Sequence, residues 1–116
     1  MAGKTDDIPG LSLIRKSDVC GLWEVIRICR EGGSETTYPW IKDRFKFNFL
    51  QEKLFLCMRD GKTIHGKWKL VKKVQEPQKR YSIILDGTYE FRIIDCSEDE
   101  LVLTDTRNNY LLVRRL

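Results

Sequence analysis

The stretch Phe45-Lys46-Phe47-Asn48-Phe49 alternates aromatic and polar residues without interruption. Successive side chains of a β-strand point to opposite faces of a sheet, so this pattern predicts a strand with one apolar face and one solvated face. The same period of two recurs in residues 63–71 and in residues 88–94. These three segments indicate that the chain is built mainly from half-buried strands.

Two aspartate-glycine pairs mark tight turns between the predicted strands. Asp60-Gly61 and Asp86-Gly87 suit type I′ hairpins, whose two central residues need a positive φ. Short turns make sequential strands antiparallel neighbours, and closing such a meander into a barrel removes its two exposed edges. The sequence therefore predicts an all-β, eight-stranded antiparallel up-and-down barrel with a short N-terminal helical turn in residues 11–20. The expected strands are residues 22–30, 45–49, 54–59, 63–71, 80–85, 88–94, 101–105 and 110–116.

The composition supports one folded domain. The 116 residues are 41% hydrophobic and 33% charged with a net charge of +4, and a chain of this length forms a single core. We expect residues 1–10 to be a flexible lead and residues 11–116 to form the domain. No apolar run approaches the roughly 20 residues of a spanning helix, so we expect no membrane span. We expect a monomer or weak dimer, either exported to the periplasm or cell envelope with its signal absent from this numbering, or cytoplasmic.

Little in the sequence points to catalysis or to metal binding. The chain has one histidine, His65, and neither a glycine-rich phosphate loop nor a closely spaced cysteine pair of the kind zinc sites use. We therefore predict no enzyme activity, no metal and no cofactor. The four cysteines could form two disulfides in an exported protein or remain small buried thiols, and the sequence leaves both alternatives open.

The start and the end of the predicted barrel resemble a known family. Gly21-Leu22-Trp23 opens the first strand after a short helical lead, and the last strand ends in Arg114-Arg115-Leu116. This pattern is similar to that of the calycin superfamily, in particular its small bacterial lipocalin-like domains. The resemblance implies that Trp23 plugs the closed end of the barrel and that Arg115, or else Arg114, packs across its ring. It also implies a non-enzymatic carrier of a small apolar or lipid-like ligand.

The inward faces of the predicted strands supply the expected core or pocket lining. An eight-stranded barrel can enclose a ligand or be filled by its own side chains, and these residues are compatible with both. If there is a pocket, we expect Phe47, Phe49, Leu56, Met58, Trp68, Tyr81 and Phe91 to contact the ligand. The full inward set is Trp23, Val25, Phe45, Phe47, Phe49, Leu54, Leu56, Met58, Ile64, Trp68, Leu70, Tyr81, Ile83, Tyr89, Phe91, Leu101 and Leu103.

Three further residues are candidate ligand contacts near the end of the first strand. Arg27 shares the strand face of Trp23, so it either points inward to bind a ligand carboxylate or is turned outward into water by a bulge. Tyr38 and Trp40 lie on the long loop of residues 32–40, where they either meet a ligand as a lid or pack permanently over the barrel end.

A basic segment supports an alternative function. Residues 62–80 carry seven lysines and arginines against one acid, Glu76. Such a segment is either a solvated face or a surface that binds a polyanion or an acidic protein. Trp68 and Tyr81 are expected to face inward, so the stacking aromatics of nucleic-acid barrels are missing and no nucleic acid is expected as a partner. The alternative to a ligand carrier is therefore a filled barrel that binds a protein or polyanion through its basic outer face and loops.

Overall fold

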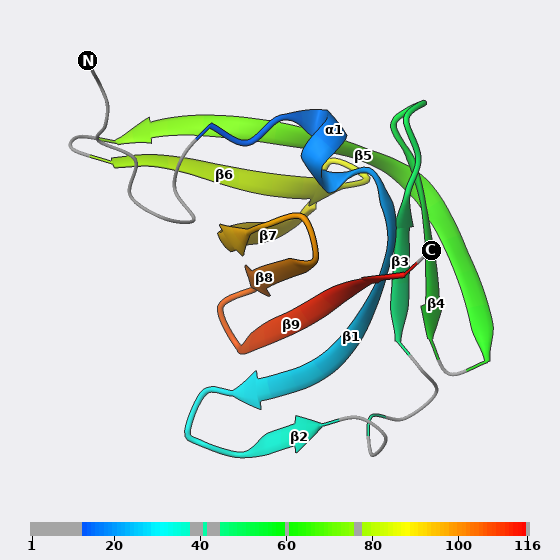
Figure 1. Cartoon of the computed structure of the whole chain (residues 1–116), viewed down its shortest axis with the longest axis vertical. Coiled ribbons are helices and arrows are strands. Elements are labelled where there is room, and N and C mark those ends of the chain that lie inside the picture. The colour runs from blue at the N-terminus through cyan, green and yellow to red at the C-terminus, as the bar shows by residue number, and fades with distance from the viewer. Residues whose placement is uncertain (1–12, 38–40, 42–44, 60, 76–77, 116) are drawn as a thin grey trace.

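Eight strands of the protein curl into one closed antiparallel barrel, as the sequence predicts (Figure 1). The computed structural model describes residues 13–37, 41, 45–59, 61–75 and 78–115. Its elements are α1 (Lys16–Val19), β1 (Gly21–Arg30), β2 (Glu35–Thr37), β3 (Lys46–Phe49), β4 (Leu54–Arg59), β5 (Lys62–Gln75), β6 (Gln78–Leu85), β7 (Tyr89–Cys96), β8 (Glu100–Thr104) and β9 (Asn108–Arg115).

The pairing of β1 with β9 closes the barrel. The sheet order is β2-β1-β3-β4-β5-β6-β7-β8-β9, and β1 also pairs with β9 from Leu22↔Arg115 to Arg30↔Asn108. The first half of β1 pairs with β3, whereas its second half pairs with the short strand β2. No strand was expected at β2, because its three residues, Glu-Thr-Thr, show no apolar alternation.

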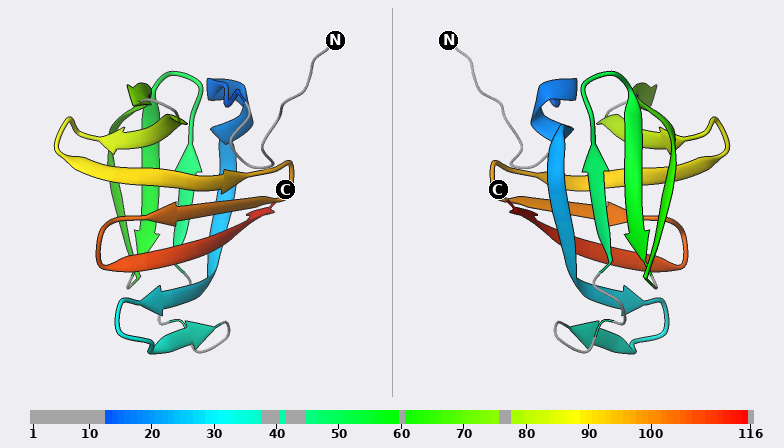
Figure 2. Two further views of the ribbon diagram at one scale, coloured as in Figure 1. Left: turned by 90° about the vertical axis from the view of Figure 1, so that its left-hand side faces the viewer. Right: turned by 90° about the vertical axis from the view of Figure 1, so that its right-hand side faces the viewer.

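Two layers of strands pack face to face around the core. Strands β7, β8 and β9 run across β3 and β4 (Figure 2). The long strand β5 belongs to both layers, since its residues up to Lys67 pair with β4 and its residues from Trp68 onward pair with β6. Side chains of both layers fill the space between them, and the most deeply buried are Trp23, Val25, Phe49, Trp68, Ile83, Leu101, Leu103 and Leu112.

Helix α1 covers one end of the barrel but is shorter than expected. The sequence predicts a helical turn in residues 11–20, whereas the helix comprises only Lys16–Val19, and Arg15 before it is extended. Residues 11 and 12 lie outside the described residues. Val19 is fully buried beneath this end. With four residues, α1 is far too short to cross a membrane, and the described residues contain no helix that could do so.

The inward face of β4 is the opposite of the predicted one. Leu54, Leu56 and Met58 were expected inside, but Phe55 is 4% exposed while Leu54 is 44% exposed. The pairing explains this, because Phe55 lies opposite Phe49 and directly opposed residues of antiparallel strands share a face. Leu56 and Met58 therefore point away from the interior, and Cys57 points into it.

Candidate functional site

The end of the barrel beside α1 is closed by a tryptophan and an arginine. Trp23 is fully buried, and its Nε1 donates a hydrogen bond to the carbonyl oxygen of Val19 at 2.8 Å. The Arg114 guanidinium lies over the indole ring, with Cζ 4.1 Å from the ring centroid. Its nitrogens also donate to the carbonyl oxygens of Asp18, Cys20 and Glu98 at 2.7–2.9 Å. This arginine therefore ties α1, β1 and the β7–β8 turn together.

The packing partner of Trp23 is thus Arg114, the second of the two arginines that the resemblance implied, and not Arg115, which it named first. Strand alternation separates the two arginines, because neighbouring residues point to opposite faces. Arg115 instead pairs with Glu24, its Nε 2.8 Å from the carboxylate. Since Glu24 is only 6% exposed, this contact satisfies a charge that would be costly to bury alone.

A second tryptophan blocks the same end. Trp68 is 2% exposed, and its Nε1 donates to the carbonyl oxygen of Leu50 at 2.9 Å. Phe49 packs against it with ring centroids 5.1 Å apart. Both residues were expected among the ligand contacts, but they lie in the filled half of the barrel. Tyr81 is also buried, at 3% exposure, and its hydroxyl has no hydrogen-bond partner among the described residues.

A cavity of about 290 Å³ occupies the opposite end of the barrel, where the β4–β5 and β6–β7 turns lie. Aromatic rings form its inner wall, and Phe91 meets Phe47 and Tyr110 edge to face with centroids 5.7 and 5.6 Å apart. Ile64 and Tyr89 share this inward face but lie at the rim, which leaves them 58% and 48% exposed. The lining residues are Phe45, Phe47, Phe55, Cys57, Arg59, Ile64, Leu85, Asp86, Thr88, Tyr89, Phe91 and Tyr110.

Arg59 brings a positive charge to this mainly apolar cavity. Its guanidinium lies over the ring of Phe45, with Cζ 4.5 Å from the centroid. Within the described part of the chain, the ion pairs leave Arg59 without a carboxylate at salt-bridge distance. A cation that stacks on an aromatic ring and has no acidic partner is suited to attract the acidic group of a ligand.

Two tyrosine hydroxyls and one carboxylate make a polar network beside the cavity. Tyr89 and Tyr110 each donate a hydrogen bond of 2.8 Å to Oδ2 of Asp105. Burial and the bond to Asp105 raise the pKa of Tyr89 to about 12. Burial alone would raise the pKa of Asp105, but bonds from the amides of Asn108 and Arg107 and from both tyrosines lower it instead. The network therefore holds both tyrosine rings in fixed positions around an ionised carboxylate.

The remaining predicted contacts lie elsewhere or outside the described residues. Arg27 points outward after a bulge between Val25 and Arg27, and its Nε lies 3.8 Å from Glu35. Leu56 and Met58 are on the outer face of β4. Tyr38 and Trp40 lie outside the described residues. Of the predicted ligand contacts that the structure describes, only Phe47 and Phe91 line the cavity.

In the part of the chain that the structure describes, the cysteines form no disulfide and, together with the acidic residues, no metal-binding cluster. Cys20, Cys29, Cys57 and Cys96 are all free thiols and partly buried. Burial raises the pKa of Cys57, and burial together with Asp18 raises the pKa of Cys96 to about 11. No group of three or more His, Cys, Asp and Glu side chains in the described residues could hold a metal ion.

The barrel is similar to a solved structure of a lipocalin-like protein from Bacteroides uniformis. The two share 19% sequence identity with a TM-score of 0.54, over 84% of this chain and 99% of the other. This chain has a lipocalin-like fold. Its sequence matches no protein-family model and no curated protein. The fold expected from Gly21-Leu22-Trp23 and the last-strand arginines is therefore confirmed, and the lipocalin-like barrel is closed beside α1 and hollowed at its other end.

Proposed function

We propose that this lipocalin-like barrel is a non-enzymatic binding protein for a small molecule with an apolar body and an acidic head group. The apolar body would lie against Phe47 and Phe91, and the head group would meet Arg59. The observation that carries the proposal is the position of Arg59, a cation without an acidic partner at salt-bridge distance among the described residues, on the wall of a mainly apolar cavity that also includes Asp86 and Thr88.

The size of the cavity favours a short ligand. Its volume of about 290 Å³ is at the lower end of the range of about 300–1,000 Å³ for small-molecule pockets. Trp23 and Trp68 fill the other half of the barrel, so a long acyl chain could not extend through it. A medium-chain carboxylate fits these limits better than a full-length fatty acid.

The test compares a carboxylate with an alcohol of the same chain length. Octanoate and octanol are titrated into the wild type by calorimetry, and then into Arg59→Gln and Arg27→Gln. Arg27→Gln is the matched control, because Arg27 is also a cation near this end but points outward and lies beside Glu35. We expect Arg59→Gln to weaken octanoate binding at least about tenfold, since a charged hydrogen bond is lost, and to change octanol binding less than about threefold.

Two results would refute the proposal. One is the absence of octanoate binding to the wild type at millimolar concentration. The other is an equal loss of octanoate affinity in Arg59→Gln and Arg27→Gln, which would show that only net charge matters. Native mass spectrometry of the purified protein adds a direct measurement of any small acid that co-purifies.

A further inference from the structure

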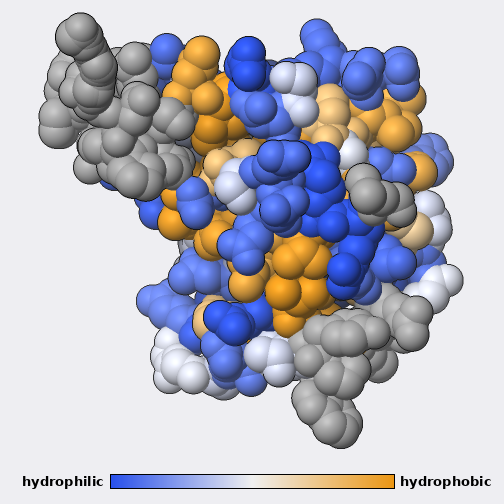
Figure 3. Space-filling view, viewed as in Figure 1, coloured by the Kyte–Doolittle hydropathy of each residue, from blue (hydrophilic) through white to orange (hydrophobic). Residues whose placement is uncertain are grey.

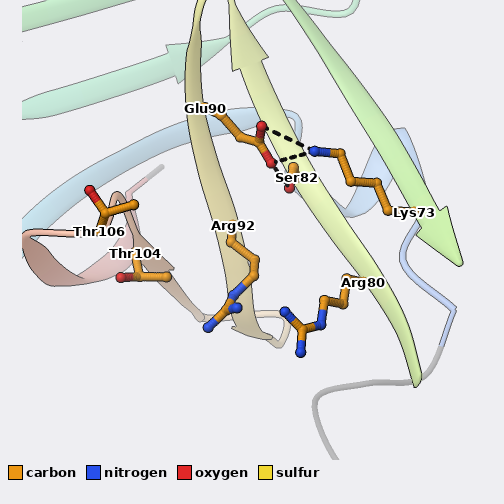
Figure 4. A pocket seen from close by; sticks show the side chains of 7 residues that line it. All are labelled: Lys73, Arg80, Ser82, Glu90, Arg92, Thr104 and Thr106. Carbon is orange, nitrogen blue, oxygen red and sulfur yellow. Dashed lines mark hydrogen bonds and ion pairs between the residues drawn. The ribbon is translucent and has the colours of Figure 1, made fainter. Parts of the chain in front are cut away.

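A second hollow lies on the outer face of the barrel, away from the proposed ligand cavity. Its volume is about 470 Å³, and its walls come from β5, β6, β7, β8 and the turn after β8 (Figure 4). The strand register places its residues on one face, because Lys73 is opposite Arg80, Ser82 is opposite Arg92, and Arg92 is opposite Thr104. On the face drawn in Figure 3, much of the surface is hydrophilic, and apolar side chains gather near its centre.

Three side chains that line this hollow, Lys73, Ser82 and Glu90, are linked by hydrogen bonds. Ser82 is only 1% exposed although it is on the outer face, and its Oγ donates a 2.7 Å hydrogen bond to Glu90. Lys73 Nζ donates to both carboxylate oxygens of Glu90, at 3.0 and 3.2 Å. Bonds from Ser82 and Lys73 lower the pKa of Glu90, so this carboxylate stays ionised and is neutralised by Lys73.

Two arginines remain in the hollow after that pairing. Arg80 and Arg92 lie on the neighbouring strands β6 and β7, both line the hollow, and both extend toward the same side in Figure 4. Among the described residues, neither guanidinium has a carboxylate within salt-bridge distance. Since Lys73 and Glu90 cancel, Arg80 and Arg92 leave a local charge of about +2, and like charges held together attract an anion.

The turn after β8 contributes to this hollow a residue with a strained backbone conformation. Thr106 lines the hollow with φ of 82°, in a region that a β-branched residue rarely adopts. Asp105 maintains this turn, since its Oδ1 accepts hydrogen bonds from the amides of Arg107 and Asn108 at 3.1 and 2.9 Å. The turn that contains Thr106 is therefore maintained by the same residue that accepts the hydrogen bonds of Tyr89 and Tyr110.

We propose that this outer hollow binds a phosphate group between the guanidinium groups of Arg80 and Arg92. A guanidinium presents a planar fork of donors that matches two phosphate oxygens, and two such forks suit a doubly charged group. Lys73 serves the site indirectly, because it neutralises Glu90 and so removes the negative charge that would repel the ligand. The site is independent of the proposed carboxylate ligand of the barrel interior.

The test uses pyrophosphate as a soluble probe and vesicles as a lipid probe. Pyrophosphate is titrated by calorimetry into the wild type, Arg80→Gln/Arg92→Gln and Lys62→Gln/Lys67→Gln. The last variant removes the same charge from β5 at positions that do not line the hollow. Vesicles of phosphatidylcholine with and without phosphatidic acid are then offered to the same three proteins. Octanoate binding is measured in parallel, because it should not change in Arg80→Gln/Arg92→Gln.

We expect the arginine variant to lose at least about tenfold in affinity for the phosphate probe and the lysine variant to lose less than about threefold. If pyrophosphate shows this pattern, the ligand is a small phosphate compound, whereas the pattern in phosphatidic acid vesicles alone identifies a lipid head group. Equal losses in both variants, or no binding to either probe at millimolar phosphate and low salt, would overturn the proposal.

Discussion

Arg114 and Trp23 form one stacked unit at the closed end of the barrel, with the guanidinium carbon 4.1 Å from the centroid of the indole. The first strand supplies the ring and the last strand supplies the cation, so the contact joins the two strands that close the sheet. The three carbonyl oxygens that accept hydrogen bonds from Arg114 belong to α1, to the residue that follows it and to the β7–β8 turn. This arrangement makes Arg114 the best single position at which to test how the barrel is closed.

Replacing Arg114 with alanine should lower the free energy of unfolding by about 2–4 kcal/mol, because the cation–π contact and three hydrogen bonds are lost together. Arg114→Lys should recover less than half of this loss, since an ammonium cannot reproduce the planar fork. The control is Arg107→Ala, an exposed residue in the β8–β9 turn, which should cost less than about 0.5 kcal/mol. Urea unfolding followed by tryptophan fluorescence measures all three. Equal effects at residues 107 and 114 would contradict the role of Arg114.

Trp68→Phe should lower stability without changing ligand binding. The variant loses the 2.9 Å hydrogen bond to Leu50 and part of a buried ring, at a cost of about 1–3 kcal/mol. Octanoate affinity should stay within about twofold, because Trp68 does not line the cavity. Phe91→Leu is the comparison, since it changes the cavity wall and should weaken binding several-fold. A large loss of octanoate affinity in Trp68→Phe would show that the ligand reaches the filled half.

Asp105→Asn should be destabilising in a way that depends on pH. The carboxylate accepts four hydrogen bonds, so the variant should lose about 1–2 kcal/mol at pH 7. Because the pKa of Asp105 is lowered below its usual 3.8 in the folded state, its contribution is present above that value. The contribution is lost as the pH falls through the folded pKa. The stability difference between wild type and variant should thus be constant from pH 5 to 7 and shrink below about pH 4 in urea titrations. A difference that grows on acidification would contradict this assignment.

Gly66→Ala should destabilise the protein through a collision with Asp86. A methyl group at residue 66 would overlap the Asp86 carboxylate, which accepts a 2.8 Å hydrogen bond from the amide of Lys67. We expect a loss of about 1–3 kcal/mol, typical of overpacking. In the background of Asp86→Gly, whose glycine suits the φ of 51° at that turn, the same change should cost less than about 1 kcal/mol. Thermal unfolding of the four proteins in this cycle gives the coupling, and additive losses would exclude the collision.

The fold followed from the sequence because alternation and turn chemistry agree over most of the chain. Residues 45–49 show one apolar face only, and Asp86-Gly87 adopts the two positive φ values that its turn requires, 51° and 74°. Strand β4 differs because it reads Leu-Phe-Leu-Cys-Met, which is apolar on both faces. A period of two cannot choose between faces in such a run, so the choice depends on the partner strand.

The wrong inward face of β4 also explains why Arg59 is not among the ligand contacts predicted from the sequence. With Phe55 and Cys57 inward, Arg59 falls on the same face and reaches the rim of the cavity. With Leu54, Leu56 and Met58 expected inward, Arg59 at the end of the predicted strand 54–59 would point outward. The converse applies to Arg27, which shares the alternation of Trp23 but is rotated outward by a bulge after Val25. A bulge depends on three-dimensional pairing and leaves no reliable mark on the residues themselves.

The ladder between β1 and β9 has a consequence for how the protein is made. Leu22 pairs with Arg115, so the residues that complete the sheet are separated by almost the whole described chain. On a ribosome, β1 would leave the exit tunnel long before β9 is synthesised. The edge of β1 that pairs with β9 would stay unpaired while β3 to β8 form hairpins one after another. The final step is then slow, since contacts distant in sequence require the closure of a large loop. During synthesis, the nascent chain would pass through an open, strand-edged intermediate that a chaperone could recognise.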